Sequence, residues 1–83
     1  MYNRIEVVKF GINLRKLREE RKISQQQLAD MADINLSTVL RIENTKTKAN
    51  IDILFSISKA LEIPVSQLFE NKEASKVKLR NLN

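Results

Sequence analysis

SQQQLADMADINLSTVLRIE, residues 24–43, contains two short helical patterns separated by a tight break. Ser24 can cap the first helix and Asn35 the second, because their side-chain oxygens can accept hydrogen bonds from early backbone N–H groups. Each pattern has apolar residues at helical spacing, which are Leu28, Ala29 and Ala32 in the first and Val39 and Ile42 in the second. Two short helices joined by so brief a turn must cross steeply, which predicts a helix-turn-helix unit whose second helix faces outward.

The composition excludes several classes of protein. A chain of 83 residues makes one small domain. It has no cysteine and no histidine, and therefore no disulfide, no thiolate metal site and not the residue that most often acts as a general base. No P-loop, GxGxxG motif or nucleophile–base pair is present, so we expect neither an enzyme nor a cofactor. No apolar run has the length of a membrane span or of a signal peptide, so we expect a cytoplasmic protein without a membrane partner.

The positive charge lies mainly at the two ends of the chain. The net charge is +5. Residues 1–23 carry +4, residues 24–48 zero, residues 49–70 −2 and residues 71–83 +3. This distribution suits an anionic partner whose phosphates are attracted by the flanks while the neutral middle reads bases. The alternative is that basic ends only keep the protein in solution.

Three further helices are predicted outside residues 24–43. The first covers roughly residues 3–21, with Ile5, Val8, Ile12 and Leu17 as its apolar stripe and Phe10 and Leu14 on an adjoining face. Another runs from Ile51 to Leu61, and a last short helix from Val65 to Glu70 follows Pro64. An all-α domain of five helices follows, and its expected core consists of Leu17, Leu28, Ile34, Val39, Ile42, Leu54, Leu61 and Leu68.

Four motifs occur in a fixed order along the chain. They are LRKLRE at 14–19, SQQQLA at 24–29, STVLRIEN at 37–44 and ISKALEIPVSQLF at 57–69. With them, the segment from Phe10 to Phe69 resembles the helix-turn-helix domain of phage repressors and their Cro-type relatives. The resemblance implies a lambda-repressor-like DNA-binding domain at 10–70, with residues 1–9 extending its first helix and residues 71–83 forming a basic, flexible tail. The size is similar to that of Cro-like regulators and of restriction–modification controller proteins.

The resemblance also implies roles for individual residues. Arg18 would form a structural ion pair with Glu43, and Gln25 would meet a phosphate at the start of its helix. The full set of DNA-binding positions is Gln25, Gln26, Asn35, Leu36, Ser37, Thr38, Leu40, Arg41, Asn44, Lys46, Thr47 and Lys48. Gln25 and Gln26 can also be read as ordinary solvent-facing helix residues, Gln26 especially.

The chemistry of these side chains supports some roles better than others. The planar fork of Arg41 matches the O6 and N7 acceptors of guanine, although a phosphate or an acidic side chain would suit it too. Ser37 and Thr38 can bond to a base or a phosphate and specify weakly. Leu36 is apolar at an exposed helix start, so it either contacts a thymine methyl or packs against its own domain.

Glycine is absent where relatives usually place it at helix ends. Lys22, Asp33, Thr45 and Glu62 occupy those positions, where a left-handed backbone costs a non-glycine residue roughly 1–2 kcal/mol. The one glycine, Gly11, lies inside the first helix, where it permits close packing.

These observations favour a sequence-specific transcriptional regulator that binds a palindromic double-stranded DNA operator as a homodimer. The resemblance places the dimer interface on the last helices, at Phe55, Val65 and Phe69. RNA polymerase would be a further partner of an activator, and no small-molecule effector is expected because no sensing domain fits. The alternatives are an antitoxin-like module whose tail binds a protein, and a non-specific nucleic-acid binder that uses charge alone.

Overall fold

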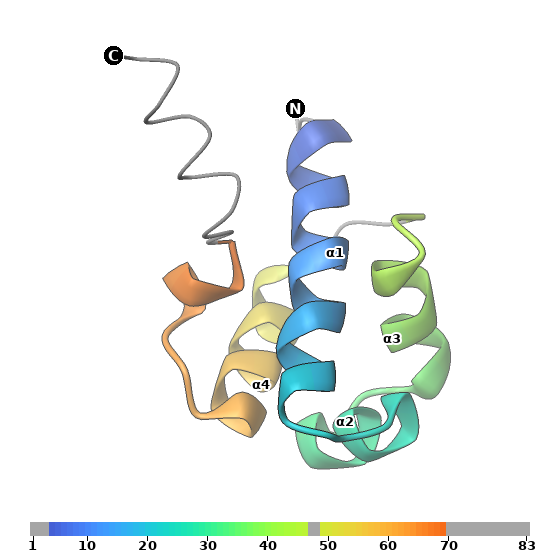
Figure 1. Ribbon diagram of the computed structural model, residues 1–83, viewed down its shortest axis with the longest axis vertical. Coiled ribbons are helices and arrows are strands. Elements are labelled where there is room, and N and C mark those ends of the chain that lie inside the picture. The colour runs from blue at the N-terminus through green and yellow to red at the C-terminus, as the bar shows by residue number, and fades with distance from the viewer. Residues whose placement is uncertain (1–3, 47–48, 70–83) are drawn as a thin grey trace.

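The computed structural model describes residues 4–46 and 49–69, which form four α-helices and one short 3-10 helix (Figure 1). In chain order these are α1 (Arg4–Glu20), α2 (Gln25–Ala32), α3 (Leu36–Glu43), α4 (Ile51–Leu61) and the 3-10 helix η1 (Val65–Leu68). The two described ranges contain no strand, so the all-α prediction is confirmed. Thr47, Lys48 and the predicted tail at 71–83 lie outside the described residues.

The last predicted helix is a short 3-10 helix, so the predicted count of five helices is not matched exactly: the described residues form four α-helices and this turn. The Gln67 N–H donates to the Pro64 carbonyl at 3.0 Å and the Phe69 N–H to the Ser66 carbonyl at 3.1 Å, each across three residues. Pro64 is extended, with ψ at 152°, so the turn begins only at Val65. A run of four residues is the length typical of an isolated 3-10 turn.

The buried face of α1 includes the predicted adjoining residues Phe10 and Leu14 but only part of the predicted stripe. Ile5 and Ile12 belong to the predicted stripe, yet they are 59% and 53% exposed. The buried apolar side chains of α1 instead recur at intervals of three, four and three residues, at Val7, Phe10, Leu14 and Leu17. Leu17 belongs to both sets, but Ile5 and Ile12 lie nearly opposite Phe10 and Leu14 around the helix, and only one side can face the rest of the domain.

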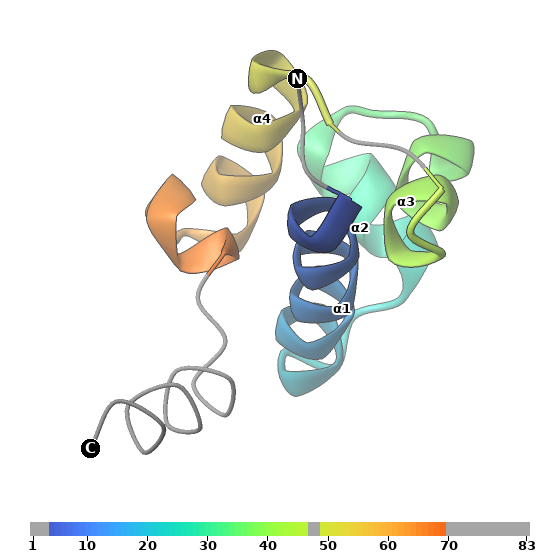
Figure 2. The same ribbon diagram turned by 90° about the horizontal axis from the view of Figure 1, so that it is seen from above.

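The core fills the space between the four α-helices and η1. Six of the eight predicted core residues are buried, namely Leu17, Leu28, Val39, Ile42, Leu61 and Leu68. The other two, Ile34 and Leu54, are half-buried and pack against this cluster. Figure 2 shows α1 between α3 on one side and the α4–η1 pair on the other. The α3 side and the α4–η1 side of the molecule are therefore separated by α1.

Capping side chains define where the helices begin. The Ser24 hydroxyl accepts a hydrogen bond from the Gln27 N–H at 3.0 Å, and the Gln27 side chain accepts one from the Ser24 N–H at 2.7 Å, a complete capping box. Asn50 caps α4 by accepting from the Ile53 N–H at 2.9 Å. Asn35 is the N-cap residue of α3 by position, but its side chain makes no capping hydrogen bond.

The turns after the helices use left-handed backbone without glycine. Lys22, Asp33, Thr45 and Glu62 have φ angles of 57°, 55°, 58° and 56°. These are the four positions at which the sequence predicted a left-handed residue, and the prediction is confirmed. The fold therefore keeps the expected turn geometry at a conformational cost that glycine would not have.

Gly11 allows the backbones of α1 and α3 to approach each other. A Cβ atom at this position would overlap the Ile42 carbonyl oxygen and would lie 3.1 Å from the Thr45 Cγ2. The prediction that Gly11 permits close packing is confirmed. Because a larger residue would push α3 away from α1, this contact helps to set the position of α3.

Candidate nucleic-acid interface

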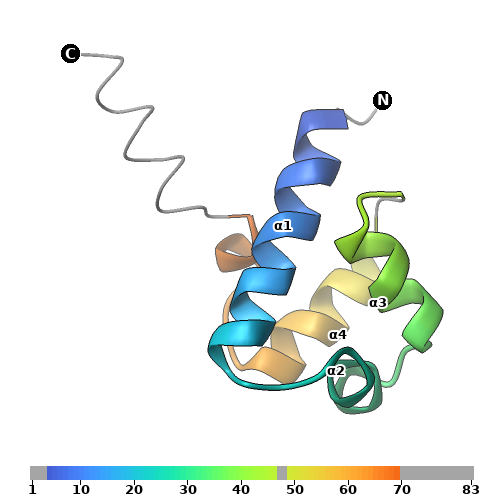
Figure 3. The same cartoon turned by 45° about the vertical axis from the view of Figure 1, so that its right-hand side comes forward.

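The two sides of α3 have opposite environments. Val39, Ile42 and Glu43 are buried against the domain. The other side carries the exposed row, which we define as Ser37, Arg41 and Asn44, spaced four and three residues apart. Figure 3 shows α3 on the outside of the molecule. A short helix held by one side with a polar row on the other has the form needed to enter a DNA major groove.

A buried hydrogen-bond network holds the inner side of α3. The Arg18 guanidinium donates to both carboxylate oxygens of Glu43, from Nε at 2.8 Å and from Nη2 at 3.0 Å. The Arg18 and Glu43 side chains are only 10% and 2% exposed. Arg18 also donates from Nη1 to the Ile23 carbonyl at 2.8 Å. The pair therefore fastens α3 to the end of α1 and to the turn that leads into α2.

Arg18 is held in its charged form. Its hydrogen bond with Glu43 raises the pKa of Arg18 above its ordinary value, against the opposing effect of desolvation. Among the described residues, every buried side-chain nitrogen or oxygen has a hydrogen-bond partner. A satisfied bidentate pair of this kind fixes orientation as well as contributing energy.

The two glutamines at the start of α2 have different partners. Gln25 is half-buried, and its Nε2 donates to Glu43 Oε1 at 3.0 Å, so it belongs to the Arg18–Glu43 network. Gln26 is exposed and donates to Asp30 Oδ1 at 2.9 Å, one helical turn along α2. Gln26 thus has the arrangement of an ordinary solvent-facing residue. The contact between Gln25 and Glu43 was not foreseen from the sequence, because it depends on how α2 meets the end of α3.

The apolar residues of α3 near the exposed row are not equivalent. Leu36 is half-buried and packs against the core, which supports the interpretation that it packs against its own domain rather than contacting a thymine methyl. Thr38 and Leu40 are also half-buried. Leu40 is neither a member of the buried core nor one of the described apolar side chains that pack against it. Leu40 therefore lies at the boundary between the inner and outer sides of α3.

The turn after α3 presents further polar residues beside the exposed row. The N–H of Lys46 donates back to the Arg41 carbonyl at 2.9 Å, and the N–H of Asn44 to the Leu40 carbonyl at 2.9 Å. The Lys46 side chain is exposed. Because these backbone bonds fold the turn against the end of α3, the Lys46 charge is carried next to the exposed row.

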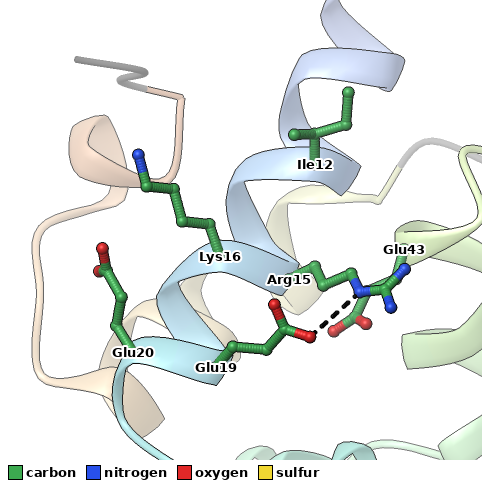
Figure 4. A pocket seen from close by; sticks show the side chains of 6 residues that line it. All are labelled: Ile12, Arg15, Lys16, Glu19, Glu20 and Glu43. Atoms are coloured by element: carbon green, nitrogen blue, oxygen red, sulfur yellow. Dashed lines mark hydrogen bonds and ion pairs between the residues drawn. The ribbon is translucent and has the colours of Figure 1, made fainter. Parts of the chain in front are cut away.

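A charged groove runs along α1 beside the end of α3 (Figure 4). Within it, Arg15 Nε pairs with Glu19 Oε2 at 3.3 Å on the exposed surface. The residues that line this groove are Ile12, Arg15, Lys16, Glu19, Glu20 and Glu43.

The described part of the chain has no group of three or more His, Cys, Asp or Glu side chains that could hold a metal ion. In the same residues, no helix is long and apolar enough to cross a membrane.

A second outer surface lies on α4 and η1, across α1 from α3 (Figure 1). Phe55 is 56% exposed and Ile51 is 65% exposed, both on α4. Phe69 is 39% exposed, and its ring stacks on Phe10 of α1 with centroids 5.3 Å apart. Val65 is half-buried. The predicted dimer residues thus come from α4, from η1 and from the residue that follows it, and not from the helix that carries the exposed row.

One buried polar residue that supports this second surface was missed in the sequence. Asn13 is 3% exposed, and its amide donates to the carbonyls of Gln67 and Leu68 at 2.9 and 2.6 Å. It therefore ties η1 to α1. The pattern that could have revealed it is a polar residue three positions after Phe10 and four before Leu17, inside the buried stripe.

The fold and the outward polar side of α3 define a DNA-binding transcriptional regulator of the helix-turn-helix class. Residues 14–68 match the helix-turn-helix family HTH_3, and the chain belongs to this family.

Known proteins with similar sequences and structures agree with this assignment. The control protein C.MunI from a Mycoplasma species is 36% identical over 67 residues, which cover 80% of this chain and 90% of that protein. The restriction-modification controller protein C.AhdI from Aeromonas hydrophila is 31% identical, with a TM-score of 0.75 over 78% of this chain and 98% of that chain. The hypothetical transcription factor NHTF from Neisseria shares the fold, with a TM-score of 0.79 at 19% identity over 95% and 91% of the two chains.

Proposed function

We propose that this protein is a restriction–modification controller that binds a palindromic operator as a homodimer and regulates transcription from it. The observation that carries the proposal is the similarity to two controller proteins along nearly their whole lengths, C.MunI and C.AhdI. The exposed row on α3 supplies the DNA-binding surface that such a function needs. A Cro-like regulator of other genes is the broader form of the same proposal.

In this proposal Ser37 and Arg41 of the exposed row read bases, whereas Asn44 and the residues around the row bind the backbone. Arg41 is exposed and can place its planar fork against guanine O6 and N7 in the major groove. Ser37 lies one helical turn earlier on the same row. Lys46 and Asn44 follow the phosphates after α3, and Asn35 and Thr38 flank its start. The segment from 24 to 48 has no net charge, so the attraction to phosphates comes from the basic ends of the chain.

The homodimer follows from the small size of the reading surface. One short helix contacts only a few base pairs, and a two-fold symmetric pair doubles these contacts on a palindrome. The exposed apolar side chains of the second surface, Ile51, Phe55 and Phe69, would be covered by those of the partner. Because this surface lies across α1 from α3, its pairing leaves both exposed rows free to meet DNA (Figure 2).

A footprint tests the proposal directly. The purified protein should protect a two-fold symmetric site in the DNA flanking its own gene, with half-sites about 34 Å, or one helical turn, apart. Sedimentation at micromolar concentration should give the mass of a dimer, and Phe55→Ser should shift it toward the monomer. Protection of one asymmetric site by a monomer would contradict the homodimer, whereas the absence of any specific site would contradict the regulator itself.

A further inference from the structure

Leu40 is an apolar side chain on the reading helix whose position the fold does not explain. It follows Leu36 by one helical turn, but only Leu36 packs against the core. Leu40 precedes Arg41 directly and lies three residues after Ser37, so it borders the exposed row. Any DNA that meets Ser37 and Arg41 must therefore also come close to Leu40.

The chemistry of the major groove restricts what Leu40 can contact. The edges of the four base pairs present hydrogen-bond donors and acceptors there, and the largest apolar group is the methyl on C5 of thymine. A leucine placed against a donor or an acceptor would remove water from it without replacing the hydrogen bond, which is unfavourable. Against a methyl group, both partners lose apolar surface to each other, which is favourable.

We propose that Leu40 is a specificity-determining residue that recognises the 5-methyl group of a thymine next to the base pair read by Arg41. The inference rests on the proposed function, because it requires α3 to lie in the major groove. It differs from the sequence-based hypothesis about Leu36, whose side chain is used by the core. It also predicts the content of the operator, which must hold a thymine at one fixed position in each half-site.

Replacement of single thymines by deoxyuridine tests the proposal, because it removes the methyl group and leaves every hydrogen-bonding group in place. The operator from the footprint is synthesised with deoxyuridine at one thymine position in both half-sites at a time. One position should weaken binding by about fourfold per half-site, the value expected for one buried methyl group. The Leu40→Ala variant should bind the thymine and the deoxyuridine operators equally at that position.

Matched variants distinguish the possible readers. Leu36→Ala should keep the difference between thymine and deoxyuridine, because Leu36 is not the contact. Leu40→Gln keeps a long side chain and high helix propensity, so it tests the contact even if Leu40→Ala fails to fold. A protein that binds its operator without any sensitive thymine, or whose sensitivity survives Leu40→Gln, would overturn the inference. Absence of operator binding altogether would instead overturn the proposed function.

Discussion

The inner and outer sides of α3 use similar residue types for different purposes. On the inner side, Arg18 of α1 is buried and donates to both carboxylate oxygens of Glu43 of α3. Arg41, on the outer side, is exposed. Arg41 and Glu43 are only two residues apart, but on a helix this places them on opposite sides. The same guanidinium chemistry therefore stabilises the fold where the carboxylate belongs to the protein and is available to DNA where it faces solvent.

The largest effect is expected at Arg18, and it should be on stability. Arg18→Met leaves the Glu43 carboxylate buried without its ion-pair partner, which should lower the free energy of unfolding by about 3–5 kcal/mol. Urea denaturation followed by circular dichroism measures this loss. Because the pKa of Arg18 is raised above its already high ordinary value, its charge contribution is fully present near neutral pH and would be lost only in strongly alkaline solution. The loss should therefore be the same at pH 6 and pH 8.

Two variants control the Arg18 prediction. Arg15→Met breaks the exposed pair with Glu19 and should cost less than about 1 kcal/mol. The double variant Arg18→Met with Glu43→Leu should recover much of the lost stability, because no unpaired charge remains buried. An Arg18→Met protein as stable as Arg15→Met would show that the buried network does not hold α3.

The next largest effect is expected at Gly11, where the backbone of α1 meets that of α3. Gly11→Ala adds a Cβ that overlaps the Ile42 carbonyl oxygen. The overlap should lower the free energy of unfolding by roughly 1–3 kcal/mol, although alanine is the better helix former. Thermal unfolding measures the change. Ile12→Ala, on the exposed side of the same helix, should change stability by less than about 0.5 kcal/mol, and equal effects at the two positions would contradict the assigned packing.

Features that depend on local chemistry could be predicted from the sequence. The caps at Ser24 and Asn50 each follow from a few neighbouring residues, whereas the left-handed turn at Thr45 is expected only from where relatives place glycine. The outward position of Arg41 also follows from its neighbours, because Val39 and Ile42 are the apolar residues that mark the inner side of this short helix.

Features that depend on packing between distant segments could not be predicted. Ile5 and Ile12 are as apolar as Val7 and Phe10 and have similar helical spacing. Only the position of α3 beside Gly11 decides which of the two faces of α1 is buried. Two further contacts likewise join residues far apart in the chain: the hydrogen bond from Gln25 to Glu43 and the hydrogen bond from Asn13 to the Leu68 carbonyl of η1.

On the outer side, the expected effect of Arg41 is on discrimination between operators. Arg41→Ala should reduce the preference for the cognate base pair over its alternatives by about 1–3 kcal/mol at one position in each half-site. Competition binding against operators changed at each position measures this preference. Arg41→Lys keeps the charge but not the planar fork, so it should lose discrimination while retaining binding to random DNA. Either variant should unfold within about 0.5 kcal/mol of the unaltered protein, unlike Arg18→Met.

The smallest effect is expected at Lys46, and it should not depend on sequence. Lys46 is exposed on the turn after α3, where its charge can meet a phosphate but its side chain lies beyond the exposed row. Lys46→Ala should weaken binding to cognate and random DNA equally and reduce the slope of log affinity against log salt concentration by about 0.9 per subunit, or about 1.8 for the dimer, because each subunit releases one counterion fewer. Lys46→Arg, which keeps the charge, should restore the slope. A loss confined to the cognate operator would show that Lys46 reads bases, and the outer side would then not divide into a reading row and a phosphate-binding turn.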